Sequence, residues 1–464
     1  MTQLQFKGEN GRDEFQREAV AAKVISLLTS TVEISPMVID GDWGTGKTEF
    51  CHKLINKFKA EHDNYQVVYV DAFQADHADA PLMTILAEVL KLLPEGEQRQ
   101  GLIQKALPVA RYGLKTLLKA GAGHILRQDA DDVADGLEEQ LKDAANKAID
   151  AAVETALKDH EKAKESLMAL QTTLADIAAD SPIVLFVDEL DRCRPDFAVQ
   201  MLEVIKHTFD VAGVQFVFVT NATQLKAAIN HSYGQGVDAQ RYLDKFLKFS
   251  FALPEVLPLQ GRDKVLASTK HFTTLIGQSE VVDKSGLNQE RDGGFKFVKS
   301  LIEVSSLSLR ETETFVRHLE IYHTLIGSSN GVESQVHYPY RMLRLAAVYL
   351  HCFYPTVARA VSRKNVDVNQ FAACFGINDV RQLVNEAPQQ RSALQVIAMM
   401  VIWDCNRASS LFAQTDDQEL NPWVNRFHDD WSGYRATYWE VPDEGGCVEI
   451  VTDALGHLSF NANL

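Results

Sequence analysis

Four short runs of apolar residues stand out in the first half of the chain. They lie at residues 36–40, 65–70, 183–187 and 214–219. Because these runs are nearly uninterrupted, they are typical of strands that are covered on both faces, as in a parallel sheet. Apolar residues recur at helical spacing over residues 13–31 and 46–58, on either side of the first run. This alternation predicts a three-layer α/β/α core with a parallel sheet.

The remaining segments have a mainly helical pattern. Residues 132–179 are charged, alanine-rich and free of proline, which predicts one or two long helices. Beyond Pro254 the pattern stays mostly helical, and residues 447–460 alternate around a turn-like Asp-Ala-Leu-Gly sequence as a hairpin does. We therefore expect a core at residues 1–255 with a helical insertion at about 95–180, a helical C-terminal region at 256–435 and a small terminal β-hairpin at 436–464.

Composition and charge narrow the class of protein. The 464 residues are 46% hydrophobic and 23% charged, which is typical of a folded protein with more than one core. A formal net charge of −17 disfavours broad contact with nucleic acid or anionic membranes and favours protein partners. The six cysteines form no C-x-x-C pair, so reduced thiols are expected rather than disulfides or a zinc site. Without a recognisable secretory signal or membrane span, we expect a cytoplasmic protein.

A glycine-rich segment follows the first apolar run and opens the helix after it. Residues 41–48, Gly-Asp-Trp-Gly-Thr-Gly-Lys-Thr, satisfy the G-x-x-x-x-G-K-S/T pattern of phosphate-binding loops. The glycines let backbone N–H groups approach phosphates at the positive end of the helix. We expect Lys47 to reach the β and γ phosphates and Thr48 to hold Mg²⁺. The predicted nucleotide-binding residues are Gly41, Asp42, Trp43, Gly44, Thr45, Gly46, Lys47, Thr48 and Glu49.

Acidic residues follow the third apolar run. Asp188 comes directly after it, at the end of a predicted strand, where open α/β sheets bind their ligands. Its predicted partner is Mg²⁺, and Glu189 is predicted to polarise the water that attacks the γ phosphate. For Asp191, a role in the site and a role as a helix cap both stay open. The acidic pair indicates hydrolysis of the nucleotide rather than binding alone.

The fourth apolar run ends in Thr220 and Asn221. A polar side chain at this strand end can contact the γ phosphate or the attacking water between the two motifs, so Asn221 is a candidate catalytic residue. The same sequence also forms an ordinary helix cap. Both interpretations of Asn221 stay open.

Four segments resemble the KAP family of P-loop NTPases. They lie at residues 41–48, 68–90, 183–196 and 239–254. The third, IVLFVDELDRCRPD, is the most diagnostic because it is a long match to the family's acidic strand end. The second has Asp71-Ala72-Phe73 where the family usually has an Asn-Ala-Trp-like turn. The resemblance covers about residues 13 to 325 and implies the P-loop NTPase fold, ATP and Mg²⁺ as cofactors, and ATP hydrolysis.

The resemblance also bears on partners and location. Many KAP proteins carry a pair of membrane helices between the phosphate loop and the acidic strand. Here Lys47 and Asp188 are 188 − 47 = 141 residues apart, but the segment between them is charged. This implies a member without membrane contact, in which the segment forms a partner-binding coiled element or a solvated helical hairpin. Prokaryotic members further imply a role in defence against phages or mobile elements, with a protein effector as partner.

The KAP family in turn resembles the AAA+ and STAND groups, which places two further candidates. Arg241 occupies about the position of an arginine finger, which would complete the site of a neighbouring subunit and couple hydrolysis to a homo-oligomer. Ion pairing of Arg241 with Asp238 or Asp244 is the alternative. The segment from Ser308 to Thr312 resembles the family's S-x-R-E segment, which makes Arg310 a candidate sensor of the nucleotide state.

Three functions are consistent with the sequence. The first is an ATPase whose nucleotide state switches the helical C-terminal region. The second is a nucleotide-dependent scaffold that oligomerises and hydrolyses little. The third is a nucleic-acid-stimulated translocase, for which a run of basic residues would supply the binding surface unless it is only a solvated helix face. The run consists of Arg341, Arg344, Arg359, Arg363 and Lys364.

Overall fold

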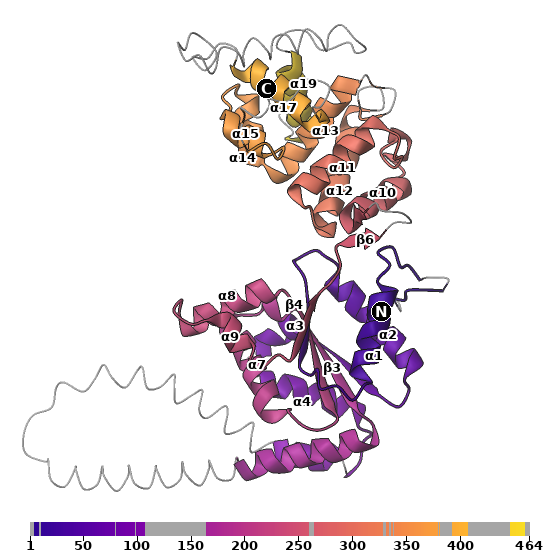
Figure 1. Ribbon diagram of the computed structural model, residues 1–464, viewed down its shortest axis with the longest axis vertical. Helices are drawn as coiled ribbons and strands as arrows, with labels where there is room; N and C mark the ends of the chain where they lie inside the picture. Colours follow the sequence, from indigo (N-terminus) through magenta and orange to yellow (C-terminus); the bar gives the residue numbers. More distant parts are fainter. Residues whose placement is uncertain are drawn as a thin grey trace, which may run out of the picture. The chain divides into compact units, whose positions relative to one another are not determined.

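The computed structural model divides the chain into two compact units, Met1–Leu253 and Pro254–Leu464 (Figure 1). The expected boundary was residue 255. The residues that the structure describes are 4–8, 11–78, 80–97, 99–106, 164–258, 264–327, 331–333, 336, 338–378, 380, 392–406 and 446–459. The greater part of the expected helical insertion, residues 107–163, therefore lies outside the described residues.

The first unit is built on a five-stranded parallel sheet. Its strands are β1 (Met37–Asp40), β2 (Gln66–Asp71), β3 (Ile183–Asp188), β4 (Val214–Thr220) and β5 (Phe249–Ala252), in the spatial order β2-β3-β4-β1-β5. The four apolar runs of the sequence correspond to β1 to β4. The predicted parallel sheet is therefore confirmed, with β5 added at one edge.

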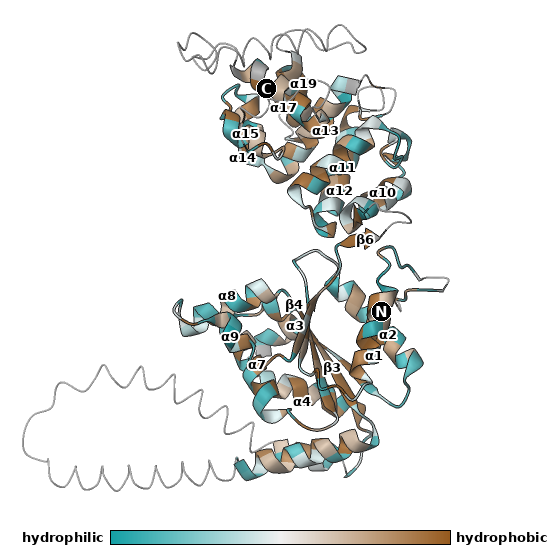
Figure 2. Ribbon diagram, in the orientation of Figure 1, coloured by the Kyte–Doolittle hydropathy of each residue, from teal (hydrophilic) through white to brown (hydrophobic). Residues whose placement is uncertain are grey.

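Helices cover both faces of this sheet. On one face lie α1 (Glu18–Leu28) and α2 (Lys47–Glu61), and on the other lie α4 (Pro81–Leu92), α7 (Pro195–Thr208) and α8 (Ala222–Tyr233). Successive strand residues point to opposite faces, so Met37 and Ile39 pack with α1 and α2, whereas Val38 packs with the other helices. The strands are accordingly apolar along their length (Figure 2), and the predicted three layers are confirmed.

Short elements connect the strand ends to the helices. They are α3 (Ala72–Ala75) and η1 (Asp76–Ala78) after β2, η2 (Leu190–Arg192) after β3, and α9 (Ala239–Leu243) before β5. Because all five strands are parallel, the residues that follow β1, β3 and β4 meet at the carboxyl end of the sheet. There β1 lies beside β4, although β2 and β3 come between them in the sequence. This end of the sheet carries the candidate site.

The described part of the second unit is helical apart from an antiparallel pair, β6 (Val256–Pro258) and β7 (Lys264–Leu266). Its helices are α10 (Ala267–Gln278), η3 (Asp283–Ser285), α11 (Gly293–Ser305), α12 (Leu309–Ile326), α13 (Tyr338–Phe353), α14 (Pro355–Ser362), α15 (Val368–Ala373), α17 (Ala393–Asn406) and α19 (Gly446–Leu458). One hydrophobic cluster joins these helices, with the fully buried Tyr349 of α13 among its largest members. Among the described helices of the chain, none is long and apolar enough to cross a bilayer.

The predicted terminal β-hairpin is wrong. Residues 446–458 form α19, and residues 436–445 lie outside the described residues. The buried residues of α19 share one helical stripe: Cys447, Val448, Val451, Ala454, Leu455 and Leu458. This spacing packs α19 against α13, α14 and α17. The turn-like Asp-Ala-Leu-Gly sequence lies within this helix: Ala454, Leu455 and Gly456 are buried and Asp453 is exposed, and tertiary packing overrides the local preference of Gly456.

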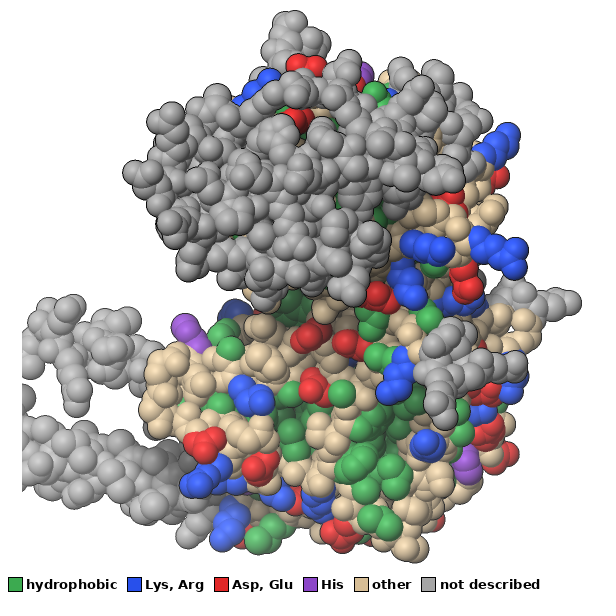
Figure 3. All heavy atoms as spheres, turned by 45° about the horizontal axis from the view of Figure 1, so that its top comes forward, with side chains coloured by type: hydrophobic (Ala, Val, Ile, Leu, Met, Phe, Trp, Pro, Cys, Tyr) green, Lys and Arg blue, Asp and Glu red, His purple; other side chains and the backbone are tan. Residues whose placement is uncertain are grey.

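The basic run after residue 340 does not form a continuous surface. Arg341 is only 3% exposed, and its guanidinium donates to the Asp292 carboxylate at 2.9 Å and to the Val332 carbonyl at 2.7 Å. Arg344 is half-buried and donates to the Gly331 carbonyl at 3.1 Å. On the face shown in Figure 3, basic side chains of the described residues lie among acidic ones. Arg341 and Arg344 are therefore not free to form the surface that the translocase hypothesis needs, and the buried Arg341 does not fit the alternative of a solvated helix face either.

Candidate nucleotide-binding site

The glycine-rich segment forms a loop between β1 and α2. Gly44 and Gly46 have φ angles of 81° and 79°, a left-handed conformation that glycine adopts without steric cost. A Cβ atom at Gly41 would lie 2.9 Å from the Thr45 hydroxyl, so this position also requires glycine. The loop leads directly into α2, which begins at Lys47. The backbone N–H groups at the start of α2 therefore form the kind of cradle that binds a phosphate.

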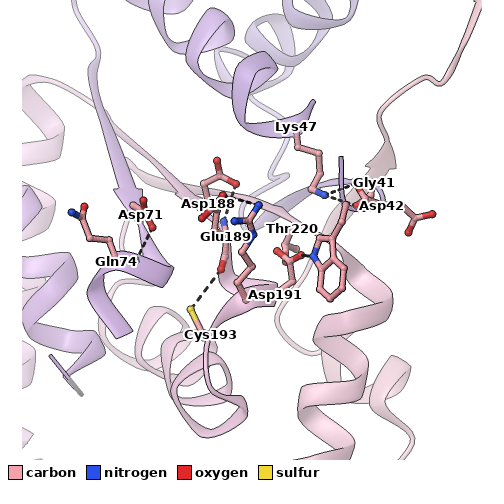
Figure 4. A network of polar contacts seen from close by, with 12 residues as sticks. Gly41, Asp42, Lys47, Asp71, Gln74, Asp188, Glu189, Asp191, Cys193 and Thr220 are labelled. Atoms are coloured by element: carbon pink, nitrogen blue, oxygen red, sulfur yellow. Dashed lines mark hydrogen bonds and ion pairs between the residues drawn. The ribbon is translucent and has the colours of Figure 1, made fainter. Parts of the chain in front are cut away.

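Lys47 lies inside this loop rather than on the surface. Its side chain is 8% exposed, and its ammonium donates to the carbonyl oxygens of Gly41 at 2.6 Å and Asp42 at 3.0 Å (Figure 4). Burial lowers the pKa of Lys47, and surrounding carboxylates oppose this shift. In decreasing order of effect, these carboxylates belong to Asp191, Asp188, Asp40 and Asp42. The structure thus places a buried cation among the acidic residues of several strand ends.

Side chains from distant elements hold the loop in place. Arg17, at the start of α1, donates to the Thr45 carbonyl at 2.9 Å. The Asn221 amide donates to the Asp42 carboxylate at 3.0 Å, while its carbonyl oxygen accepts from the N–H of Thr223 at 2.9 Å. Asn221 therefore caps α8, as one interpretation of its sequence holds, and also contacts the phosphate loop; a contact with the γ phosphate or the attacking water stays a prediction.

Asp188 is buried at the end of β3. Burial raises the pKa of Asp188 to about 6, and hydrogen bonds from the Thr48 hydroxyl and the Glu189 N–H partly offset this effect. The Tyr69 hydroxyl of β2 also donates to this carboxylate, at 3.2 Å. Asp188 and Thr48, predicted as metal ligands from distant parts of the sequence, are thus in contact. Their carboxylate and hydroxyl oxygens are the ligand types that Mg²⁺ prefers.

Glu189 follows Asp188 in a left-handed conformation, with φ of 60°. This conformation is uncommon for a residue with a side chain and is typical of functional sites. Its carboxylate forms an ion pair with Arg192 at 3.1 Å across the turn of η2. Cys193 directly follows η2. Burial raises the pKa of its thiol to about 12, so the thiol stays protonated.

Asp191 lies between the loop and the end of β4. One of its carboxylate oxygens accepts a hydrogen bond from the indole N–H of Trp43, and the other accepts from the Thr220 hydroxyl at 3.1 Å (Figure 4). Asp191 thus contacts both the phosphate loop and the neighbouring strand end.

The other predicted residues lie in different settings. Glu49, in the first turn of α2, forms an ion pair with Lys53 at 2.6 Å. Arg241, on α9, has an 86% exposed side chain that pairs with Asp238 at 3.3 Å. Arg310 is exposed at the start of the helical unit's α12, where Ser308 and Glu311 form a capping box. Arg310 and Lys47 belong to different units.

Two residues that contact the site, Arg17 and Tyr69, were not among the residues predicted from the sequence. Arg17 supports the loop from α1, and Tyr69 contacts Asp188 from β2. Tyr69 sits in an ordinary strand pattern, which carries no sign of its contact. Arg17 lies at the N-cap of α1, where the helix dipole disfavours a positive charge. This unfavourable position is a weak sign in the sequence that the residue has a special role.

The comparisons with known proteins agree with this geometry. The family model described as the KAP family P-loop domain matches residues 17–326, more than half of the chain. The protein belongs to the KAP family. This confirms the resemblance drawn from the four sequence segments. The KAP match extends past Leu253 to the end of α12, so it includes part of the helical unit and Arg310.

The other two comparisons add little to the KAP assignment. No curated protein matches the chain. Among solved structures, the Aeropyrum pernix ORC2 protein, in its ADPNP-ADP complexes, is 12% identical over 96% of this chain and 94% of its own, with a TM-score of 0.29. A DNA replication initiation factor is 11% identical over 96% and 95%, with a TM-score of 0.31. Scores this low do not establish a common arrangement of the whole chains.

Proposed function

We propose that this KAP protein binds ATP together with Mg²⁺, hydrolyses it, and uses the nucleotide state as a switch. The observation that carries the proposal is the contact between the Thr48 hydroxyl and the buried Asp188 carboxylate, beside Lys47 and with Glu189 next in sequence. A buried carboxylate with a raised pKa is costly to ionise without a cation nearby. A divalent cation held by Thr48 and Asp188 removes that cost, so these residues fit the metal that the family implies.

In this proposal each residue has a distinct task. Backbone N–H groups of residues 44–48 bind the phosphates, and Lys47 transfers its hydrogen bonds from the loop carbonyls to the phosphate oxygens. Mg²⁺, when bound, neutralises negative charge on the phosphates. Glu189 orients the attacking water and accepts its proton, and Asn221 contacts the same water or the γ phosphate.

The test compares Glu189→Gln with the wild type. Glutamine keeps the size of the side chain but cannot accept a proton, so we expect ATP turnover to fall by about 10²-fold or more while the affinity for ATP changes little. Steady-state phosphate release and ATP binding measured by calorimetry check this. Equal, near-zero turnover in both proteins would exclude the ATPase. Glu95→Gln, at a side chain of the same unit that is 94% exposed, is the matched control and should behave as the wild type.

A scaffold is the second candidate, and one contact favours it. The Glu189 carboxylate is paired with Arg192 at 3.1 Å, and this partner competes with an attacking water for the carboxylate. A protein of this kind would oligomerise on ATP binding and hydrolyse slowly.

For either function we propose that Arg241, exposed on α9, acts as an arginine finger on the nucleotide of a neighbouring copy. Native mass with and without ATP tests assembly, and unchanged assembly and turnover in Arg241→Ala would exclude the finger.

The biological setting we propose is defence against phages or mobile elements, with a protein effector as partner. What supports this is membership of the KAP family together with the acidic net charge, which favours protein partners over nucleic acid. Plaque formation on cells that carry the gene and its neighbours tests it. Equal phage sensitivity with the wild type and with Lys47→Ala would count against defence.

A further inference from the structure

The carboxylate of Asp191 has both of its oxygens engaged by two different motifs. One oxygen accepts from the indole N–H of Trp43 in the phosphate loop, 148 positions earlier in the chain. The other accepts from the hydroxyl of Thr220, the last residue of β4, at 3.1 Å. Asp191 itself belongs to η2, the turn that follows the acidic strand. One side chain therefore joins three strand ends, as Figure 4 shows for Asp191 and Thr220.

Trp43 is a large aromatic residue that is 49% exposed, so burial of the ring does not account for its position. Its neighbour in the loop, Gly44, has a positive φ and no side chain that could hold the backbone. Other side-chain contacts of the phosphate-loop motif involve Arg17 on α1, Asn221 at the start of α8, Asp40, which accepts from the Gly41 N–H, and Asp188, which accepts from Thr48, and none of these residues belongs to η2. Among the described contacts, the bond from Trp43 is the one that ties the loop to η2.

We propose that Asp191 is a positioning residue of the nucleotide site, acting through Trp43 and Thr220. Its two hydrogen bonds hold the phosphate loop and the turn η2 in one arrangement before nucleotide arrives. A loop that is already in its binding conformation loses less conformational entropy when a phosphate binds. η2 also carries Arg192, the ion-pair partner of Glu189, so the same turn links the loop to the hydrolytic residue. The inference rests on the proposed nucleotide-binding function.

Two other roles for Asp191 make different predictions. Asp191 is the carboxylate with the largest electrostatic effect on Lys47, so its charge alone could be what matters. It could also serve only the local turn of η2. Asparagine separates hydrogen bonding from charge, because its carbonyl oxygen accepts from the Trp43 indole while its amide donates to the Thr220 hydroxyl. Asp191→Asn thus keeps both bonds and removes the charge.

The test uses Asp191→Ala, Asp191→Asn, Trp43→Phe and the double variant Trp43→Phe/Asp191→Ala. ATP affinity is measured by calorimetry in the full chain. We expect Trp43→Phe to weaken ATP binding about fivefold, as the loss of one hydrogen bond does, and Asp191→Ala to weaken it at least as much, because it also removes the bond to Thr220. The double variant should lose no more than Asp191→Ala, because both of its changes remove the bond between Trp43 and Asp191. Asp191→Asn should stay within about twofold of the wild type.

A second measurement does not depend on nucleotide. Amide hydrogen exchange over residues 41–46 should become faster in Asp191→Ala and Trp43→Phe and stay unchanged in Asp191→Asn. Tyr233→Phe is the matched control, since it removes an aromatic donor to a carboxylate, Glu203, elsewhere in the same unit. It should leave both exchange and affinity unchanged.

The outcomes separate this inference from the proposed function. If Asp191→Asn loses as much affinity as Asp191→Ala, the charge is what matters and the positioning role is wrong. If Trp43→Phe changes neither exchange nor affinity, the bond to Trp43 has no such role. Absence of ATP hydrolysis in the wild type would overturn the proposed ATPase, but the exchange and binding measurements would still decide whether Asp191 positions the loop.

Discussion

Each of the two units buries a basic side chain, and the two are held in opposite ways. Lys47 in the first unit donates to two carbonyl oxygens of its own loop, while the carboxylates around it belong to other strand ends. Arg341 in the helical unit is paired directly with Asp292 and donates to the carbonyls of Val332 and Ser285. Arg341 is thus committed to protein partners, whereas Lys47 has partners that a phosphate can replace.

The difference shows how to tell a binding cation from a structural one. Loop carbonyls are neutral acceptors, so exchanging them for phosphate oxygens strengthens the hydrogen bonds of Lys47. The acceptors of Arg341 include a carboxylate, and the guanidinium fills its space: a Cβ added at Gly294 would lie 2.6 Å from its Cζ atom. Burial alone does not distinguish the two residues, but the chemistry of their acceptors does.

The largest effect we predict is on stability, for Arg341→Ala. Removing this side chain leaves the Asp292 carboxylate without its cation, and breaking a buried ion pair of this kind costs roughly 3–5 kcal/mol. Scanning calorimetry of the whole chain, with hydrogen exchange over α11 and α13, measures the loss and assigns it to the helical unit. The control is Arg359→Ala, which truncates an exposed arginine of the same unit and should cost no more than about 0.5 kcal/mol. Equal losses in both variants would contradict the comparison.

Lys47→Ala should have the opposite profile. It removes charge-assisted hydrogen bonds to phosphate, so we expect ATP affinity to fall roughly 100-fold, which corresponds to about 2.7 kcal/mol. Stability without nucleotide should change by less than about 1 kcal/mol, because the bonds lost are to exchangeable loop carbonyls. Calorimetric titration and thermal unfolding check the two halves of this prediction. Lys59→Ala, at the exposed end of the same helix α2, should change neither quantity.

The sequence predicted those parts of the molecule that depend on local signals. Strands β1 to β4 are continuous apolar runs, and the phosphate loop has fixed spacing between a strand and a helix, so both were identified correctly. The predicted terminal hairpin is wrong because residues 447–458 carry a helical stripe as well as an alternating pattern, and packing of that stripe on α13 favours the helix. Neither interpretation of the basic run, nucleic-acid surface or solvated helix face, describes Arg341, because the sequence does not reveal that this side chain is buried.

Contacts between distant segments were out of reach for a different reason. Trp43 and Asp191 are 148 positions apart, and Tyr69 and Asp188 are 119 apart. The parallel register that sets Asp71 beside Asp188 brings Tyr69 of β2 close to the acidic strand, and this register exists only in the folded sheet. Local patterns therefore predicted which residues belong to the site's motifs, but not which side chains connect one motif to another.

Arg310→Gln gives the smallest expected effect on stability and asks whether the helical unit takes part in the nucleotide chemistry. Arg310 is exposed in the first turn of α12, where the helix dipole disfavours a positive charge. Removing that charge should therefore leave the unit as stable or more stable, by up to about 0.5 kcal/mol. If Arg310 senses the nucleotide, ATP turnover should nevertheless fall, by about tenfold. Arg317→Gln on the same helix is the matched control. A stability gain with unchanged turnover would mean that Arg310, like Arg341, does not act on the nucleotide.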